Sequence, residues 1–340
     1  MNMNKRVKVL VVDDSLIFRE VLAQRISSDP LLQVVATAGD PFEARDKIIE
    51  HRPDVMTCDI EMPRMNGIEF IQRLLPQYPL PVVVVSSISN AVFRALNAGA
   101  VDFVTKPDVK SAGSVKAFLE EVILKIKIAS QAKVKSGNEN TLTAQVSQTS
   151  SDSKGKIIAI GASTGGIEAI FNLLQGLSKN GPGIVVVQHI PPVFSKMFAE
   201  RLNQTTPFEV KEAQTDDYVE KGRVLIAPGD KHMRIKKVGL SYRVECFSED
   251  KVNGHCPSVD VLFSSVAKEA GSNAIGVILT GMGYDGAKGL LAMRRRGART
   301  IGQDEKTAVV YGMPKVAYDV GAVEKQAAIN EIPFVISRML

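Results

Sequence analysis

A short apolar run, a turn of small residues and a helical spacing meet around Ser163. The run Ile157–Ile160 predicts a buried strand, Gly161-Ala-Ser-Thr-Gly-Gly166 predicts a tight turn, and the residues from Ile167 onward have helical period. Ser163 is therefore expected at a sheet edge beside a helix N-terminus. Backbone N–H groups and the helix dipole can stabilise an oxyanion at such a place, so this position suits a nucleophilic serine.

The turn around Ser163 fits an esterase motif better than a nucleotide-binding motif. A dinucleotide fingerprint requires glycine where Ser163 stands, and a P-loop requires lysine where Ile167 follows the glycines. The esterase pattern Gly-x-Ser-x-Gly matches Gly161 to Gly165. Because the pattern is short, an ordinary strand–helix turn is the alternative until a base and an acid are found.

His189 is the leading candidate for the base that such a serine needs. It follows the apolar run Ile184–Val187 closely, so we expect it at a strand end, as we expect Ser163. The other histidines lie in polar loops or in the N-terminal part of the chain, and His232 is the second choice among them: His51, His232 and His255.

Asp285 is the leading candidate for the acid that orients the base. It follows the predicted strand Ala274–Leu279 through a glycine-rich turn and precedes a predicted helix. The carboxyl ends of parallel strands meet at one rim, so the three candidate side chains are expected there together. Thr164 and Met282 could offer backbone N–H groups to an oxyanion at this rim. The competing aspartates are Asp216, Asp217 and Asp230.

A second group of polar residues lies at predicted strand ends in the N-terminal part of the chain. Asp13 and Asp14 end the first strand, Asp59 the third and Ser86 the fourth, and Lys106 follows the fifth. Three carboxylates at one sheet edge favour a hard cation such as Mg²⁺ among them. With a lysine charge and a hydroxyl nearby, they suit phosphoryl transfer onto Asp59.

Predicted strands and helices alternate along both parts of the chain. In the first part, strands are predicted at Val7–Val12, Gln33–Ala38, Val55–Cys58, Val82–Val85 and Phe103–Val104, with helices at Ser15–Ile26, Phe42–His51, Ile68–Leu75, Ala91–Ala98 and Val115–Ile128. In the second part, strands are predicted at Ile157–Ile160, Ile184–Val187, Val224–Ile226, Ala274–Leu279 and Thr300–Ile301, with helices at Ile167–Leu177, Lys196–Asn203, Val259–Ala270 and Ala287–Arg296. Ser258 is the expected N-cap of the Val259 helix.

This alternation predicts two α/β domains with parallel or mostly parallel sheets covered on both faces. The stretch from Ser130 to Lys156 is rich in Ser, Gln, Thr, Lys and Asn and predicts a flexible linker. The expected organisation is a first domain at residues 1–128, a linker at 129–155 and a second domain at 156–340.

Composition excludes several classes of protein. The chain has 340 residues, 45% of them hydrophobic and 23% charged, as in ordinary globular proteins. The net charge of +5 is mild, and the basic run Arg294–Arg296 ends a predicted helix, where cations suit the dipole, so nucleic-acid binding is not expected. Three cysteines without metal-type spacing indicate a reducing compartment. With no signal peptide and no run long enough to insert in a membrane, a cytoplasmic location is expected.

The N-terminal motifs resemble the response-regulator receiver family. The matching segments are Val11-Val-Asp13-Asp14-Ser15, Cys58-Asp59-Ile-Glu-Met-Pro63, Val85-Ser86-Ser87 and Phe103-Val-Thr-Lys106-Pro107. The resemblance implies a five-stranded parallel, flavodoxin-like sheet and phosphorylation of Asp59 by a chemotaxis histidine kinase. It also implies that Asp13, Asp14 and Asp59 hold Mg²⁺, and that Ser86, Phe103 and Lys106 form the switch that reads the phosphate.

The C-terminal motifs resemble the chemotaxis protein-glutamate methylesterase family. The matching segments are Gly161–Gly166, Gln188–Pro192, Ala227–Met233, Pro257–Asp260 and Leu279–Gly286. The resemblance implies a triad of Ser163, His189 and Asp285 that hydrolyses glutamate γ-methyl esters on the cytoplasmic helices of methyl-accepting chemoreceptors, without a cofactor. It further implies deamidation of certain receptor glutamines, and a receiver that covers the active-site rim until it is phosphorylated.

Two other functions fit parts of the sequence less well. A receiver joined to a DNA-binding module would need a helix-turn-helix pattern or a clustered basic face, and the second half has neither pattern. A serine hydrolase for a small ester is harder to exclude, because a sequence does not display the shape of a pocket. The α/β-hydrolase elbow is disfavoured, since its acid precedes its histidine in the chain, whereas His189 precedes Asp285.

Overall fold

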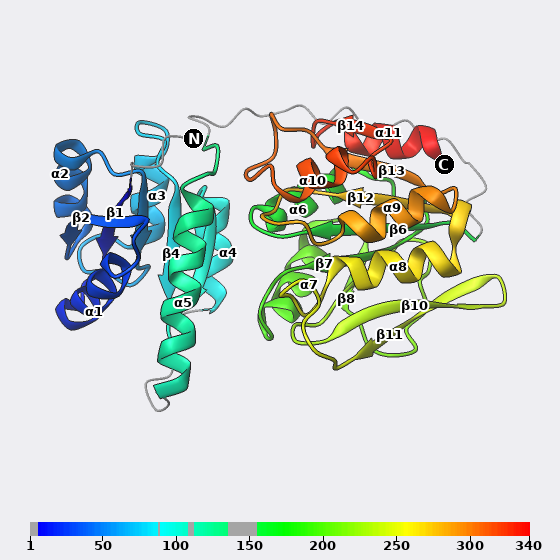
Figure 1. Cartoon of the computed structure of the whole chain (residues 1–340), viewed down its shortest axis with the longest axis horizontal. Coiled ribbons are helices and arrows are strands. Elements are labelled where there is room, and N and C mark those ends of the chain that lie inside the picture. The colour runs from blue at the N-terminus through cyan, green and yellow to red at the C-terminus, as the bar shows by residue number, and fades with distance from the viewer. Residues whose placement is uncertain (1–5, 88, 108–111, 135–154) are drawn as a thin grey trace. The chain divides into compact units, whose positions relative to one another are not determined.

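The computed structural model describes residues 6–87, 89–107, 112–134 and 155–340. The chain divides into two compact units, Met1–Glu139 and Asn140–Leu340 (Figure 1). Most of the predicted linker at 129–155, namely residues 135–154, lies outside the described residues.

The first unit contains a parallel five-stranded sheet of order β2-β1-β3-β4-β5. Its strands are β1 (Val7–Val12), β2 (Leu32–Ala38), β3 (Val55–Cys58), β4 (Val82–Ser86) and β5 (Asp102–Thr105). The chain runs from β1 outward to β2 and then returns to the other side of β1 through β3. The strand order therefore reverses between β1 and β3, and α/β sheets commonly bind ligands at the carboxyl ends of such strands.

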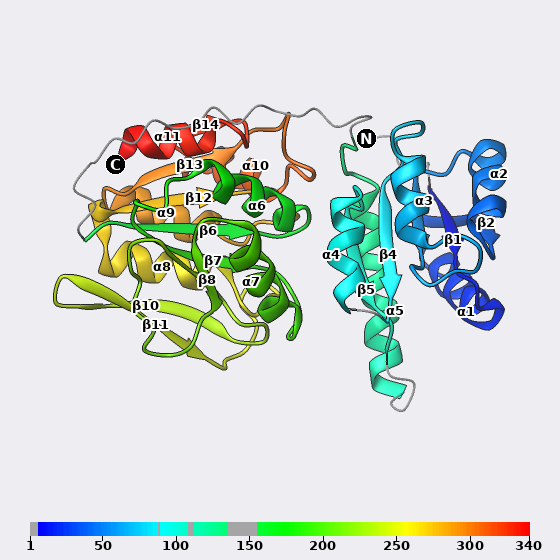
Figure 2. The same cartoon turned by 180° about the vertical axis from the view of Figure 1, so that it is seen from behind.

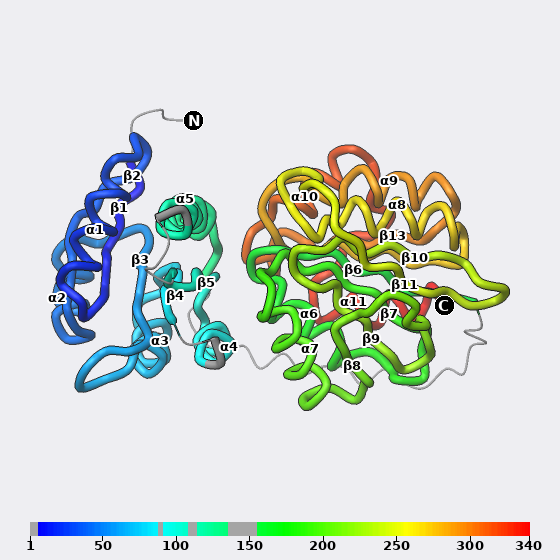
Figure 3. Tube along the Cα trace, turned by 90° about the horizontal axis from the view of Figure 1, so that it is seen from below, coloured from blue at the N-terminus to red at the C-terminus, as the bar shows by residue number. Residues whose placement is uncertain are grey.

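Helices cover both faces of this first sheet. They are α1 (Leu16–Ser27), α2 (Pro41–His51), α3 (Gly67–Leu74), α4 (Ser89–Asn97) and α5 (Ala112–Ala129). Figure 3 shows α5 on one face and α3 with α4 on the other. Side-chain caps start several helices: Asp40 accepts N–H bonds at the start of α2, and Asn66 accepts one at the start of α3.

The second unit is built on a seven-stranded sheet of order β14-β13-β12-β6-β7-β9-β8, in which every neighbouring pair is parallel. Its strands are β6 (Ile157–Ala162), β7 (Gly183–Gln188), β8 (Glu209–Glu212), β9 (Arg223–Ile226), β12 (Ala274–Ile278), β13 (Arg299–Gln303) and β14 (Lys325–Ala327). The parallel sheets of both units confirm the predicted fold class.

Helices also cover both faces of the seven-stranded sheet. They are α6 (Gly166–Gly176), α7 (Phe194–Thr205), α8 (Val259–Glu269), α9 (Ala287–Arg295), α10 (Met313–Asp319) and α11 (Ile332–Met339), with a 3₁₀ turn at Gly271–Asn273. Figure 1 shows α8 and α9 in front of the sheet, and Figure 2, seen from behind, shows α6 and α7 on the opposite face.

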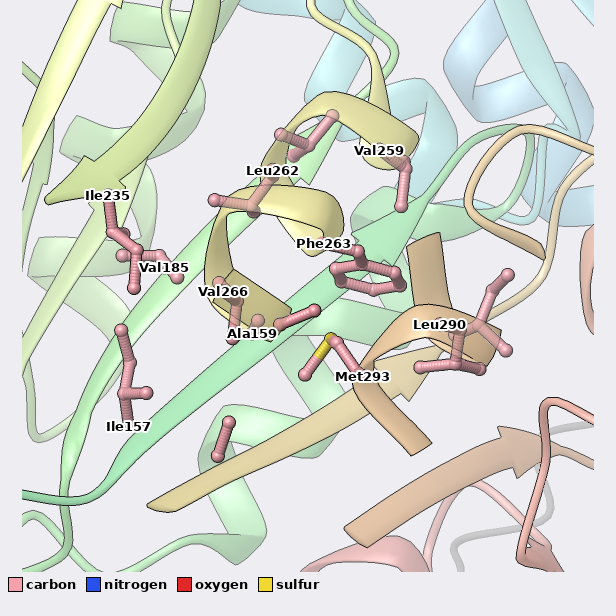
Figure 4. Close-up of a cluster of buried hydrophobic side chains, with 14 of the residues drawn as sticks. Ile157, Ala159, Val185, Ile235, Val259, Leu262, Phe263, Val266, Leu290 and Met293 are labelled. Carbon is pink, nitrogen blue, oxygen red and sulfur yellow. The ribbon is translucent and has the colours of Figure 1, made fainter. Parts of the chain in front are cut away.

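A large buried cluster of the second unit lies between this sheet and α8. Along α8, buried side chains recur at Val259, Leu262, Phe263 and Val266, which is the spacing of one helix face. They pack with Ile157, Ala159 and Val185 from the sheet and with Leu290 and Met293 from α9 (Figure 4). Both faces of β6 are buried, so the strand is apolar throughout rather than alternating.

Several elements of the second unit do not read as apolar runs and were not predicted from the sequence. The strands β8 and β14 are short and largely polar and lie at the two ends of the sheet order. The antiparallel pair β10 (His232–Val238) and β11 (Ser241–Phe247) was also missed. Placing His232 in a polar loop was wrong: it begins β10 and is fully buried. The alternation of Met233 and Ile235 with polar residues was the available signal.

We expect the α8 face to dominate the stability of the second unit. Phe263→Ala should destabilise the folded chain by ~3–5 kcal/mol, because it opens a cavity at a fully buried position. The matching loss in melting temperature is roughly 6–20 °C for a unit of this size, measured by calorimetry on the full chain. Phe334→Ala is the control, since Phe334 is 53% exposed. Equal losses for the two variants would contradict this account of the core.

Candidate functional site

The candidate triad lies at the reversal point of the seven-stranded sheet. The Ser163 turn follows β6, His189 follows β7, and the loop that carries Asp285 follows β12. In the sheet β6 stands between β12 and β7. The chain leaves β6 on one side and returns on the other, so the carboxyl ends of these strands are where an open α/β sheet commonly binds its ligand.

The turn that carries Ser163 is held by backbone bonds and by a buried threonine. Ser163 N–H donates to the Thr280 carbonyl at 3.0 Å, and Thr280 Oγ1 donates to the Thr164 carbonyl at 2.9 Å. Gly165 has φ +77°, a left-handed conformation that glycine adopts without strain, and α6 begins at the next residue. The helix N-terminus therefore lies beside the serine, as expected.

His189 stands next to Ser163 through strand register. Ala162 of β6 pairs with Gln188 of β7, so Ser163 and His189 are the residues that follow this pair on neighbouring strands about 4.8 Å apart. His189 N–H extends the ladder by donating to the Ala162 carbonyl at 3.1 Å. Gln188 Nε2 ties the two ends together, donating to the Ser163 carbonyl at 2.9 Å and to the His189 carbonyl at 3.1 Å.

The imidazole of His189 pairs with the carboxylate of Asp285. His189 Nε2 lies 2.9 Å from Asp285 Oδ2, and both side chains are buried. The other ring nitrogen, Nδ1, is buried and has no hydrogen-bond partner within the described residues. The pair therefore leaves Nδ1 as the nitrogen that can accept a proton. The competing acids differ: Asp216 pairs with Arg243, and Asp217 with Lys211.

The carboxylate of Asp285 also serves as the N-terminal cap of α8. It accepts N–H bonds from Val259 at 2.7 Å and Asp260 at 3.2 Å, and side-chain bonds from Ser258 Oγ and Asn253 Nδ2 at 2.8 Å each. The Ser258 prediction was therefore half right. Ser258 occupies the N-cap position, but its hydroxyl makes no cap bond to the helix and donates to Asp285 instead.

These donors keep Asp285 ionised despite its burial. Burial opposes ionisation, but the hydrogen bonds from His189, Asn253 and Ser258 outweigh it, so the pKa of Asp285 lies well below its ordinary value. The neighbouring Asp260 shows the opposite balance. Burial, with the charge of Asp285, raises its pKa above the ordinary value.

The loop after β12 lies directly against the serine. A Cβ added to Gly281 would stand 2.7 Å from Ser163 Cβ, so only glycine allows this approach. Met282 follows in the same loop, and Thr164 is buried in the serine turn. The backbone N–H groups predicted to serve as oxyanion donors thus belong to two segments that meet at Ser163.

The structure gives the remaining histidines near the site supporting roles. His232 Nδ1 accepts the Ser258 N–H at 3.2 Å, and its Nε2 lies 3.0 Å from the Asp250 carbonyl, so both nitrogens are used within the fold. The His255 ring stacks on His189 with centroids 3.7 Å apart and planes 10° apart. This contact was not predicted from the sequence, although the Asn253-Gly254 pair beside it is a strong turn signal.

The candidate phosphorylation site lies at the reversal point of the first sheet. Ligand oxygens of Asp13, Asp14 and Asp59 lie within 4.8 Å of one another. Lys106 Nζ lies 2.7 Å from Oδ2 of Asp13 and 2.7 Å from Oδ2 of Asp59. An all-oxygen set of three carboxylates is the donor chemistry that Mg²⁺ prefers, so these residues fit such an ion.

Electrostatics at this site favour a cation. Burial raises the pKa of Asp59 above its ordinary value; the Asp13 charge adds to the rise, and the Lys106 bond opposes it. Burial likewise disfavours the Lys106 ammonium, but its bonds to Asp13 and Asp59 outweigh that cost and raise its pKa.

The two remaining residues expected in the receiver switch lie on the neighbouring strands β4 and β5. Ser86 ends β4 and Phe103 lies in β5, and both are buried. Lys106 N–H donates to the Ser86 carbonyl at 3.0 Å, which links the lysine directly to the end of β4.

Comparisons with known proteins give a separate family match for each of the two units of the chain. Residues 158–336 match the family model CheB methylesterase, and residues 9–112 match the response regulator receiver domain. A protein-glutamate methylesterase/protein-glutamine glutaminase of Syntrophomonas wolfei is 59% identical over 328 residues, 96% of each chain. One from Syntrophotalea carbinolica is 49% identical, covering 97% of this chain and 96% of the relative.

The second unit is similar to a methylesterase domain of known structure. The crystal structure of the Thermotoga maritima CheB methylesterase catalytic domain has 40% identity and a TM-score of 0.53, covering 55% of this chain and 99% of that chain. Among the residues the structure describes, no helix combines the length and apolarity needed to cross a membrane.

The low pKa of Asp285 predicts a pH-dependent contribution to stability. A carboxyl group with a depressed folded-state pKa stabilises the fold fully above its unfolded pKa of about 3.9, and loses this contribution as pH falls. Asp285→Asn should therefore lower stability at pH 7 by ~1–3 kcal/mol, and the difference should shrink towards pH 3.

Melting temperatures of both full-length proteins between pH 7 and pH 3 test this expectation. Asp319→Asn is the matched control, because Asp319 is exposed and pairs only with Lys315 on the same helix turn among the ion pairs of the described residues. A deficit for Asp285→Asn that grows as the pH falls from 4 to 3 would contradict the assignment.

Proposed function

Because the chain belongs to the CheB methylesterase family and carries a response regulator receiver domain, we propose that it is a phosphorylation-activated serine esterase. It hydrolyses glutamate γ-methyl esters on chemoreceptors and deamidates receptor glutamines, as sensory adaptation requires. The observation that carries the catalytic assignment is the 2.9 Å bond between His189 Nε2 and Asp285 Oδ2. His189 follows the strand β7, which is the neighbour of the strand β6 that leads to Ser163.

The first half of the reaction is acyl transfer to Ser163. Its Oγ attacks the ester carbonyl carbon while His189 Nδ1 takes the hydroxyl proton. Asp285 holds the imidazole by Nε2 and stabilises the positive charge that forms on the ring. As the C–O bond to methoxide breaks, Nδ1 returns the proton to the leaving group and methanol departs.

The second half repeats these roles with water as the nucleophile. Water loses a proton to His189 Nδ1 and attacks the acyl carbon, and the proton passes to Ser163 Oγ as it leaves. The product is a glutamate side chain and the free serine. A glutamine amide follows the same course with ammonia as the leaving group, so one site can serve both reactions.

Backbone donors stabilise the negative charge on the carbonyl oxygen in each half. We assign this role to the N–H groups of Thr164 and Met282, which belong to the segments that meet at Ser163. The N-terminus of α6, which begins at Gly166, adds favourable dipole charge at the same place.

Regulation begins at Asp59 in the receiver unit. A chemotaxis histidine kinase is the phosphodonor, and Asp59 is the acceptor. Mg²⁺ held by Asp13, Asp14 and Asp59 would neutralise charge on the transferring phosphoryl group. Lys106 provides a second positive charge at the acceptor carboxylate, and Ser86 and Phe103 respond to the phosphate.

Phosphorylation controls the esterase by shifting a conformational equilibrium. The unphosphorylated receiver favours an arrangement of the two units in which receptor helices do not reach Ser163. Phosphorylation of Asp59 favours the arrangement in which they do. The size of the activation is set by how much the phosphate changes the free-energy difference between the two arrangements.

Ser163→Ala tests the proposed nucleophile. Methanol release from methylated receptor should fall by at least ~10³-fold, because no hydroxyl remains to form the acyl-enzyme. Ser178→Ala is the matched control: Ser178 lies in the loop after α6, where its hydroxyl accepts a local backbone N–H bond, and the variant should retain the parent rate. Substantial activity in Ser163→Ala would rule out the triad.

Asp59→Ala tests the proposed regulation. A small acyl phosphate with Mg²⁺ should stimulate methanol release by the parent chain, whereas the ratio of rates with and without the donor should be about one for the variant, since the acceptor is gone. Asp46→Ala removes an exposed receiver aspartate that pairs with Arg45 and should keep the stimulation. Full stimulation of Asp59→Ala would refute the assignment.

A further inference from the structure

We propose that Asn253 is a positioning residue for ester hydrolysis, because its side-chain amide holds Asp285 in the orientation that pairs this carboxylate with His189. The inference rests on the proposed roles of His189 and Asp285 and extends them to a residue that acts through Asp285.

A backbone turn fixes the position of the Asn253 side chain. Val252 and His255 exchange both backbone N–H bonds at 3.0 Å, which closes a two-residue turn over Asn253 and Gly254. Both central residues have positive φ, +54° and +83°. This is the pattern of a type I′ turn, for which Asn-Gly is the favoured sequence. The asparagine is therefore set at a defined position rather than on a loose loop.

The amide stands between two carboxylates. Asn253 Nδ2 donates to Asp260 Oδ2 at 2.7 Å and to Asp285 Oδ1 at 2.8 Å. Both carboxyl groups belong to buried residues, which are 8% and 2% exposed. Without a donor between them, two such groups would repel each other in a medium of low dielectric constant. An amide NH₂ is suited to this place because it supplies two protons without a charge of its own.

Loss of the amide would leave each carboxylate with its other donors but with no donor between them. Asp260 Oδ1 accepts the Gly289 N–H at 2.6 Å, which joins the first turn of α8 to α9. The Asp260 backbone is part of α8 itself. Asp285 keeps Ser258 Oγ and the first two N–H groups of α8 as donors. Repulsion between the carboxylates would therefore shift Asp285 within this cap, and a small shift disturbs the alignment of its Oδ2 with His189 Nε2. The raised pKa of Asp260, caused by burial and by the charge of Asp285, agrees with this proximity.

The same turn also contacts the base. His255 stacks on the His189 ring, so the Val252–His255 turn contacts the carboxylate through Asn253 and the imidazole through His255. A misplaced base or acid affects proton transfer rather than substrate binding. Loss of the amide should therefore lower kcat and leave KM nearly unchanged.

Two substitutions distinguish the contribution of the Asn253 side-chain amide from that of the backbone turn. Asn253→Gly removes the side chain and tolerates the positive φ, so it tests the hydrogen bonds without adding strain. Asn253→Asp keeps the shape and replaces the donor with a third carboxyl group. We expect kcat for methanol release to fall on the order of 10–100-fold in Asn253→Gly and further in Asn253→Asp, with KM within about twofold of the parent.

Asn203→Ala is the matched control. Asn203 also bridges elements through its side chain, since its Oδ1 accepts the Val210 N–H at 2.9 Å between α7 and β8. It should lose stability but keep kcat per folded molecule. All variants are full-length chains assayed with methylated receptor, together with the parent and Ser163→Ala, and melting temperatures give the folded fraction of each.

The outcomes distinguish this inference from the proposed function. A parent that releases no methanol, or a fully active Ser163→Ala, would overturn the proposed function. An active parent with unchanged kcat in Asn253→Gly would overturn the positioning role alone. A fall in kcat equal to that of Asn203→Ala, or a rise in KM without a fall in kcat, would also overturn it. A selective fall in kcat supports it.

Discussion

The second unit depends on one buried negative charge, the carboxylate of Asp285. It caps α8 through the N–H groups of Val259 and Asp260, and it fixes the imidazole of His189. A buried carboxylate is costly unless donors surround it, and here backbone, hydroxyl, amide and imidazole donors converge on it. Helix packing and catalytic geometry therefore share a single requirement, because moving Asp285 would uncap a core helix and release the base together.

The two units use the same topological position for different chemistry. Each places its charged residues where the strand order reverses, at the carboxyl ends of parallel strands. In the first unit, Asp13 and Asp59 form ion pairs with Lys106. Together with Asp14 they provide carboxylate oxygens that could bind a cation. In the second unit, Asp285 meets an imidazole instead. The first arrangement suits phosphate chemistry, whereas the second suits proton transfer to and from a serine.

Close packing around the serine turn explains why so many small residues are needed there. A Cβ on Gly161 would lie 2.2 Å from Val259 Cγ1, and one on Gly281 would lie 2.7 Å from Ser163 Cβ. These approaches bring the start of α8 and the loop after β12 against β6. The apolar packing of Phe263 holds α8 in that position, so the core and the site are continuous.

Local periodicity was enough to predict the alternation of strands and helices, the two α/β folds and the candidate residues at strand ends. The tertiary fold alone set which strands are neighbours, and so which strand ends meet. It also decided that Nε2 rather than Nδ1 of His189 faces Asp285, that Ser258 serves the carboxylate instead of its own helix, and that Asn253 bridges two acids. These contacts join residues far apart in the chain, and local propensity carries no information about them.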